Sequence, residues 1–202
     1  MPSLISFLPK SEQLTLLDDL NYLNMDEIRE FCDEHKVPYT IWVESADKKL
    51  RKTRDDDRKG VILDRIRHYL KTGSIPDATR FPSSVVCYDD PPAKLKATDR
   101  LFYGHYDKKG DAMINLLKSL TGGRFRNGAI ARILAREFWS KGIAPTYKEF
   151  ATAWLEANES HKRPRPEWAF LSDRTDGTAT ADWKKLRQEK AMHVLGALSR
   201  IE

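Results

Sequence analysis

The chain has few cysteines and no long apolar segment. Its two cysteines, Cys32 and Cys87, give no disulfide framework, which is typical of proteins in a reducing compartment. No apolar run approaches the ~20 residues that a helix needs to span a bilayer. Residues 1–9 lack the basic start and the cleavage site of a signal peptide. We therefore expect a cytoplasmic protein that makes no membrane contact.

The sequence also lacks a recognisable catalytic or metal-binding arrangement. Cys32 and His35 have a spacing that suits a metal, but no second ligand pair accompanies them, and His105 has no partner His or Cys cluster. Residues 122–127 do not have the glycine and lysine spacing of a phosphate-binding loop. No Ser/His/Asp order or nucleophile elbow is present. We expect no cofactor and no enzymatic activity.

The composition is that of a folded protein with an excess of positive charge. Its 202 residues are enough for one ordinary domain or two small ones, since a domain has roughly 100–200 residues. Hydrophobic residues make up 40% of the chain and charged residues 32%, and the formal net charge is +5. A positive net charge favours an anionic partner such as nucleic acid.

Two short amphipathic helices are predicted between Leu23 and Leu70. Asn24 is a good N-cap for the first helix, with Glu27 three residues later as part of a capping box. The second helix is expected over residues 60–71, and Gly73 ends it. A polar, heavily charged loop separates them. Such a pair buries little surface alone, so we expect a simple binding role for its basic edge.

Residues 23–38 and 59–66 carry a family pattern. The first run is a helix that ends in a basic residue followed by Val37 and Pro38, and the second has a Lys, two apolar residues, an Arg and a further apolar residue in order. Both runs resemble a SAP domain, a helix–extended loop–helix module. The resemblance implies binding of DNA, typically AT-rich, through the loop and the start of the second helix. Lys36 stands where the family prefers glycine, and the loop is unusually long.

Basic residues of the loop and of the second helix are the candidate DNA contacts. The second helix offers an N-terminus whose N–H groups favour anions, and we expect its Lys59 and Arg65 to be exposed. The loop is predicted either to contact nucleic acid or to be a solvated, flexible insertion. Its Tyr39 and Trp42 either stack on bases or pack on the helices, while three neighbouring aspartates repel phosphate. The candidate contacts are Lys48, Lys49, Arg51, Lys52, Arg54, Arg58, Lys59, Arg65 and Arg67.

The rest of the chain is predicted to be a linker and a helical domain. Residues 1–75 form the SAP-like domain, including a lead-in helix before Leu23. Residues 76–97 hold several of the ten prolines and are predicted to be a linker. Residues 98–202 are predicted to form a small helical domain. Its helices are expected over residues 111–120, after Asn127, and over residues 146–159 and 180–201.

The segment from Asn127 to Asn158 weakly resembles an uncharacterised bacterial helical domain that accompanies SAP-like modules. The shared positions include Phe150 and Trp154. We therefore expect an all-α protein in two parts that binds DNA with low sequence specificity, through contacts to the backbone. The alternative is a protein–protein interaction protein. In that case exposed Trp or Phe side chains of the C-terminal domain bind a partner, and the basic loop is incidental.

Overall fold

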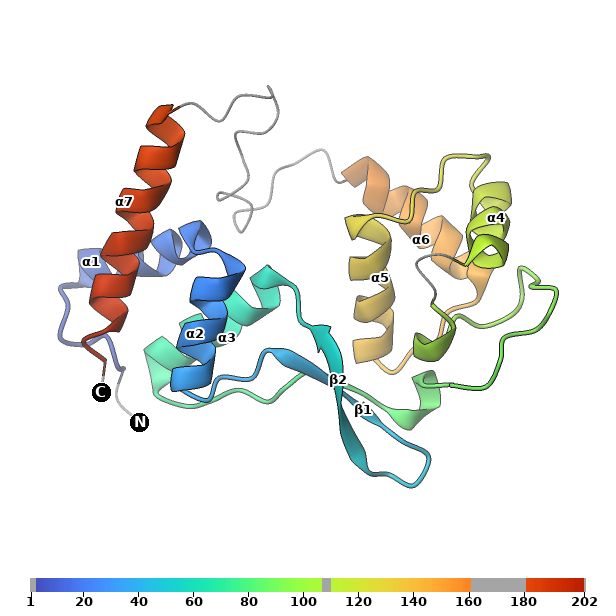
Figure 1. Ribbon diagram of the computed structural model, residues 1–202, viewed down its shortest axis with the longest axis horizontal. Helices are drawn as coiled ribbons and strands as arrows, with labels where there is room; N and C mark the ends of the chain where they lie inside the picture. The colour runs from blue at the N-terminus through green and yellow to red at the C-terminus, as the bar shows by residue number, and fades with distance from the viewer. Residues whose placement is uncertain (1–2, 107–109, 161–180, 202) are drawn as a thin grey trace. The chain divides into compact units, whose positions relative to one another are not determined.

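The computed structural model describes residues 3–106, 110–160 and 181–201 (Figure 1). Helices dominate the described residues, which also contain three short strands and three 3-10 turns. In chain order the elements are α1 (Lys10–Asp19), η1 (Leu20–Tyr22), α2 (Met25–Glu34), β1 (Thr40–Glu44), β2 (Leu50–Asp56), α3 (Lys59–Thr72), β3 (Arg80–Phe81), η2 (Ser83–Val85), η3 (Tyr103–His105), α4 (Asp111–Leu120), α5 (Ala129–Ser140), α6 (Tyr147–Ser160) and α7 (Ala181–Leu198).

The described residues form two compact units. Unit 1 contains residues 3–39, 57–78 and 181–201, and unit 2 contains residues 40–56, 79–106 and 110–160. This division differs from the ranges predicted from the sequence, which were 1–75, 76–97 and 98–202. The expected loop contributes strands β1 and β2 to unit 2, the expected linker contributes β3 to the same unit, and α7 belongs to unit 1.

The all-α prediction is wrong, because unit 2 contains a three-stranded sheet with the order β2-β1-β3. Strand β1 pairs antiparallel with β2, forming the twisted ribbon in Figure 1, and parallel with β3. The β-branched residues Ile41 and Val43 alternate with Trp42 and Glu44, so that one side of β1 is buried and the other is partly exposed. Strand β2 is rich in charged residues, and its sequence therefore resembles a loop.

The helical signals around α2 and α3 are confirmed. Asn24 accepts hydrogen bonds from the N–H groups of Asp26 and Glu27 at 2.8 and 2.9 Å, and the Glu27 carboxylate accepts the Asn24 N–H at 2.7 Å. This is the complete capping box. Helix α3 ends at Gly73, whose φ of 68° is the left-handed conformation that glycine adopts without strain.

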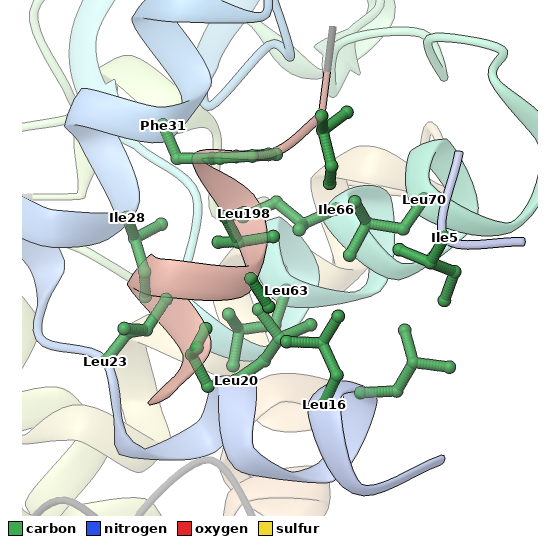
Figure 2. Packing of buried hydrophobic residues seen from close by; sticks show 14 of the residues in the cluster. Ile5, Leu16, Leu20, Leu23, Ile28, Phe31, Leu63, Ile66, Leu70 and Leu198 are labelled. Carbon is green, nitrogen blue, oxygen red and sulfur yellow. The ribbon is translucent and has the colours of Figure 1, made fainter. Parts of the chain in front are cut away.

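Helix α7 completes the core of unit 1. Figure 2 shows Leu198 of α7 among side chains of α2 and α3, where Phe31 and Ile66 also lie, and all three are buried. Polar contacts fix the same helix. The Arg187 guanidinium donates to the Glu27 carboxylate at 2.6 Å and to the Tyr22 carbonyl at 3.1 Å. The last predicted helix therefore closes the N-terminal core rather than a C-terminal one.

The core of unit 2 is built from aromatic side chains. Phe81 of β3 packs edge-on against Trp139 of α5, with ring centroids 5.7 Å apart, and Tyr103 contacts the same indole at 5.5 Å. Phe125 lies against Trp154 of α6 at 5.2 Å. Aromatic pairs add to the hydrophobic stabilisation of a core, and these two contacts of Trp139 are edge-to-face. The inner face of the sheet is thus packed on α5.

The hypothesis of a protein partner depended on exposed aromatic residues in the C-terminal helices. Trp139, Phe150 and Trp154 are buried, and so they offer no such surface. Trp168 and the side chain of Trp183 lie outside the described residues. Among the helices described here, none is both long and apolar enough to cross a bilayer.

The placement of α7 predicts unequal effects of two leucine substitutions. Leu198 is 3% exposed, whereas Leu195 on the same helix is 37% exposed. Leu198→Ala is expected to lower the free energy of unfolding by about 2–5 kcal/mol because it leaves a cavity. Leu195→Ala is the control and should cost less than about 1 kcal/mol. Urea denaturation measures both, and equal losses would show that α7 does not pack as described.

A second prediction concerns Lys36, which has a φ of 59° after the end of α2. Its left-handed backbone lets the Val37 N–H bond the Cys32 carbonyl at 2.9 Å. A side chain with a β-carbon is strained there, so Lys36→Gly should stabilise the protein by about 1 kcal/mol. Lys36→Ala keeps the β-carbon and should not stabilise it. Thermal melting distinguishes the two variants, and the idea fails if alanine stabilises as much as glycine.

Candidate nucleic-acid interface

The turn between β1 and β2 is held by its own short polar side chains. The Lys48 N–H bonds the Ser45 carbonyl at 2.8 Å, and the Ser45 N–H bonds the Lys49 carbonyl at 2.9 Å. The Ser45 hydroxyl donates to the Asp47 carboxylate, and this bond is the main reason that the pKa of Asp47 lies below its usual value. Lys48 has a φ of 60°, a position that hairpins of this type usually give to glycine. The turn is therefore ordered by local chemistry.

Five of the nine candidate contacts lie together on this hairpin, and all five are exposed. Lys49 forms an ion pair with Asp47 at 3.0 Å. In the described part of the chain, no ion pair or side-chain hydrogen bond engages the cationic groups of Lys48, Lys52 and Arg54 within 4.0 Å. The five residues are Lys48, Lys49, Arg51, Lys52 and Arg54. The hairpin therefore presents a cluster of cations to solvent.

The acidic residues at the end of β2 turn inward. The Asp55 carboxylate accepts hydrogen bonds from the Tyr103 hydroxyl at 2.9 Å and from the Arg136 guanidinium at 3.1 Å. Arg136 also donates to the Asp56 carbonyl at 2.9 Å. Burial and the neighbouring carboxylate raise the pKa of Tyr103 far above its usual value, so its hydroxyl remains a donor. Arg136 thus neutralises Asp55, and the repulsion of phosphate by the aspartates is weaker than expected.

A β-bulge lies where the outward cations give way to the inward Asp55 carboxylate, and it contains both Arg54 and Asp55. Thr40 pairs with Asp56, and Trp42 pairs with Lys52. One residue, Ile41, therefore lies between the paired positions on β1, whereas three residues, 53–55, lie between them on β2. Thr53 fills the irregularity, because its hydroxyl donates to the Ile41 carbonyl at 2.8 Å and accepts the Asp55 N–H at 3.0 Å. Bulges of this kind redirect side chains.

The candidate contacts on α3 are engaged within unit 1. The Lys59 ammonium donates to the Asn21 carbonyl at 2.6 Å. The Arg67 guanidinium donates to the Leu17 carbonyl at 3.1 Å and to the Asn21 side chain at 3.0 Å. Arg58 is the half-buried N-cap residue of the same helix. The Lys59 and Arg67 side chains lie on α3, as the sequence predicted, but their cationic groups bond the end of α1 and the residues after it.

The expectation that Arg65 is exposed is wrong. Arg65 and Asp57 are only 8% and 7% exposed, and their side chains form an ion pair at 2.7 Å. Arg65 also donates to the Pro38 carbonyl at 3.0 Å, and the Asp57 N–H bonds the Tyr39 carbonyl at 2.8 Å. The chain leaves unit 1 after Tyr39 and returns at Asp57. We call this group of contacts the clasp, since it joins the two ends of the hairpin segment.

The sheet aligns a tryptophan with two cations on its solvent face. Trp42 of β1 pairs with Lys52 of β2 on one side and with Arg80 of β3 on the other. Residues paired across a sheet project to the same face. Lys52 and Arg80 are exposed and Trp42 is half-buried, whereas Val43 and Phe81 in the next row are buried in the core.

Sequence reasoning missed Arg80 and Arg136. Arg80 fell within the expected linker, and Arg136 within a C-terminal helix with no visible link to the loop. The one available signal was the alternation of β-branched residues at 41 and 43, which predicts a strand rather than a loop. A strand there needs partners, and the partner β3 is separated from β1 by helix α3.

The comparisons with known proteins add no family to this geometry. No protein-family model matches the chain, and no curated protein or solved structure matches it significantly. The resemblance to a SAP domain therefore stays a prediction. Within the residues that the structure describes, no three His, Cys, Asp or Glu side chains gather as a metal site would require.

The clasp predicts a large loss of stability when one charge is removed. Arg65→Ala leaves the buried Asp57 carboxylate without its partner, and we expect the free energy of unfolding to fall by about 3–5 kcal/mol. Lys185→Ala removes an exposed pair with Glu189 and should cost less than about 1 kcal/mol. Urea denaturation monitored by circular dichroism measures both. A loss at Arg65 no larger than that at Lys185 would contradict the clasp.

Proposed function

We propose that this protein is a nucleic-acid-associated accessory protein that binds DNA through the β1–β2 hairpin with little sequence discrimination. One observation carries the proposal: five exposed cations lie on one ordered hairpin, and the carboxylates of Asp47 and Asp55 are engaged by hydrogen bonds or ion pairs. Cations that neutralise phosphates release condensed counterions, which supplies most of the affinity in non-specific DNA binding.

The shape of the hairpin supports the same function. A two-stranded β-ribbon is one of the elements that fit the major groove of B-DNA. Long Lys and Arg side chains on such a ribbon reach phosphates, and phosphate contacts position a protein without reading sequence. The proposal moves the main contact from α3, where the SAP resemblance implied it, to the hairpin, because Lys59, Arg65 and Arg67 are engaged within unit 1.

We further propose a cytoplasmic location. Both cysteines are free, and burial raises the pKa of Cys32 to about 12, so this thiol stays protonated and unreactive. Free thiols are typical of a reducing compartment.

The salt dependence of DNA binding tests the proposal. With roughly three to five phosphate contacts, the logarithm of the association constant should fall with the logarithm of salt concentration with a slope between about −2.7 and −4.5. The measurement is fluorescence anisotropy of a labelled 20-base-pair duplex with the full chain at several salt concentrations. Two unrelated duplex sequences should give similar slopes. Binding that does not respond to salt would refute the proposal.

A pair of charge-removing variants locates the contact. Lys52→Gln with Arg54→Gln should weaken duplex binding and flatten the salt slope by about 2 units. The matched control is Lys118→Gln with Lys148→Gln, which removes the same charge from exposed positions of α4 and α6. The control should retain the wild-type slope. Equal weakening by both pairs would show that net charge, rather than the hairpin, binds the duplex.

A further inference from the structure

The solvent face of the sheet holds an aromatic ring between two cations. Trp42 lies on the central strand, and its neighbours in register are Lys52 and Arg80. Adjacent strands are about 4.8 Å apart, so both cationic side chains start close to the tryptophan. Trp42 is half-buried, yet it is not among the half-buried residues that pack on the core of unit 2. Part of its indole is therefore available to a ligand.

The backbone beneath this ring is held on both sides. The Trp42 N–H donates to the Thr79 carbonyl at 2.9 Å, and β2 pairs with the other edge of β1. Glu44 is the carboxylate on the same side of β1, and it accepts hydrogen bonds from the Ser83 N–H and hydroxyl at 3.1 and 3.3 Å. Its charge is thus directed at Ser83, and the ring stands on a fixed platform.

We infer that the face formed by Trp42, Lys52 and Arg80 binds single-stranded nucleic acid, with one base stacked on the indole and the phosphates beside it at the two cations. A basic surface with an accessible aromatic ring is the usual design for single strands. In a duplex the base faces are covered by neighbouring base pairs, so that side chains stack mainly on unpaired bases. An acidic peptide would satisfy the cations but would leave the ring without a planar partner.

This inference rests on the proposed nucleic-acid binding of the hairpin and adds the form of nucleic acid that it prefers. Stacking is tolerant of sequence, because every base has a π-face. Stacking therefore raises the affinity for unpaired strands without discriminating between sequences, and this agrees with the low sequence discrimination of the proposed function.

Binding of the full chain to a labelled 15-nucleotide oligothymidylate and to a labelled 15-base-pair duplex tests the inference. Trp42→Ala should weaken oligothymidylate binding about 5- to 150-fold, the range for the loss of one stacked base. It should change duplex binding less than twofold. Trp42→Phe keeps a ring and should retain most of the affinity. Tyr88→Ala removes another exposed aromatic residue of unit 2 and should have no effect on either ligand.

Tryptophan fluorescence supplies a second readout. Oligothymidylate should quench part of the emission of the wild-type chain, and this quenching should be absent in Trp42→Phe. Circular dichroism confirms that each variant is folded. Equal weakening of both ligands by Trp42→Ala, or no weakening of oligothymidylate, would overturn the inference.

Two further outcomes separate this inference from the proposed function. If the wild-type chain binds neither ligand, both proposals fail together. If it binds the duplex with the expected salt slope but shows no effect of Trp42→Ala on oligothymidylate, only the inference fails. Displacement of oligothymidylate by an oligoglutamate peptide at equal charge concentration would also overturn it, since the face would then recognise charge alone.

Discussion

The buried ion pair between Arg65 and Asp57 is the constraint on which the candidate interface depends. Two charges removed from water are tolerated only when they satisfy each other and their remaining hydrogen bonds. Here the guanidinium also bonds the Pro38 carbonyl, and the Asp57 N–H bonds the Tyr39 carbonyl. An isolated two-stranded hairpin is marginally stable in water. Fixing both ends of the 40–56 segment lowers the entropy that its formation must overcome.

Strand β2 separates two roles within seven residues. Arg51, Lys52 and Arg54 are exposed cations, and near the end of the strand the Asp55 carboxylate is directed to Tyr103 and Arg136. The bulge at residues 53–55 makes this division possible, because a regular strand would continue the alternation unchanged. The aspartates that looked unfavourable beside a DNA contact therefore hold the hairpin to its own unit.

Sequence reasoning predicted the features that depend on local chemistry. The capping box at Asn24, the end of α3 at Gly73 and the bounds of α4 follow from residues within a few positions of one another. The hairpin was missed because β2 has poor strand propensity and is stabilised by pairing with β1. The position of α7 was missed because Arg187 bonds Glu27 across 160 residues. No local pattern encodes such a contact.

In the candidate site, too, the sequence predicted the features that depend on local residues and missed those that depend on distant contacts. Exposure of the hairpin cations follows from their charge, and the sequence predicted it. Arg65 is buried because the fold brings the Asp57 carboxylate to it, and Lys59 is engaged because the fold brings the Asn21 carbonyl to it. The periodicity of the sequence does not predict either contact. The row of Arg80, Trp42 and Lys52 likewise exists only once β3 joins the sheet.

The discontinuity of unit 1 has a consequence for biosynthesis. Its core needs Val194 and Leu198, which the ribosome makes after every described residue of unit 2. Domains tend to fold during translation once their residues are available. Unit 2 can therefore fold while α1, α2 and α3 still expose the apolar side chains that α7 covers. During that interval the nascent chain presents a ready site for chaperones, and the time that the last segment takes to emerge sets how long the site stays open.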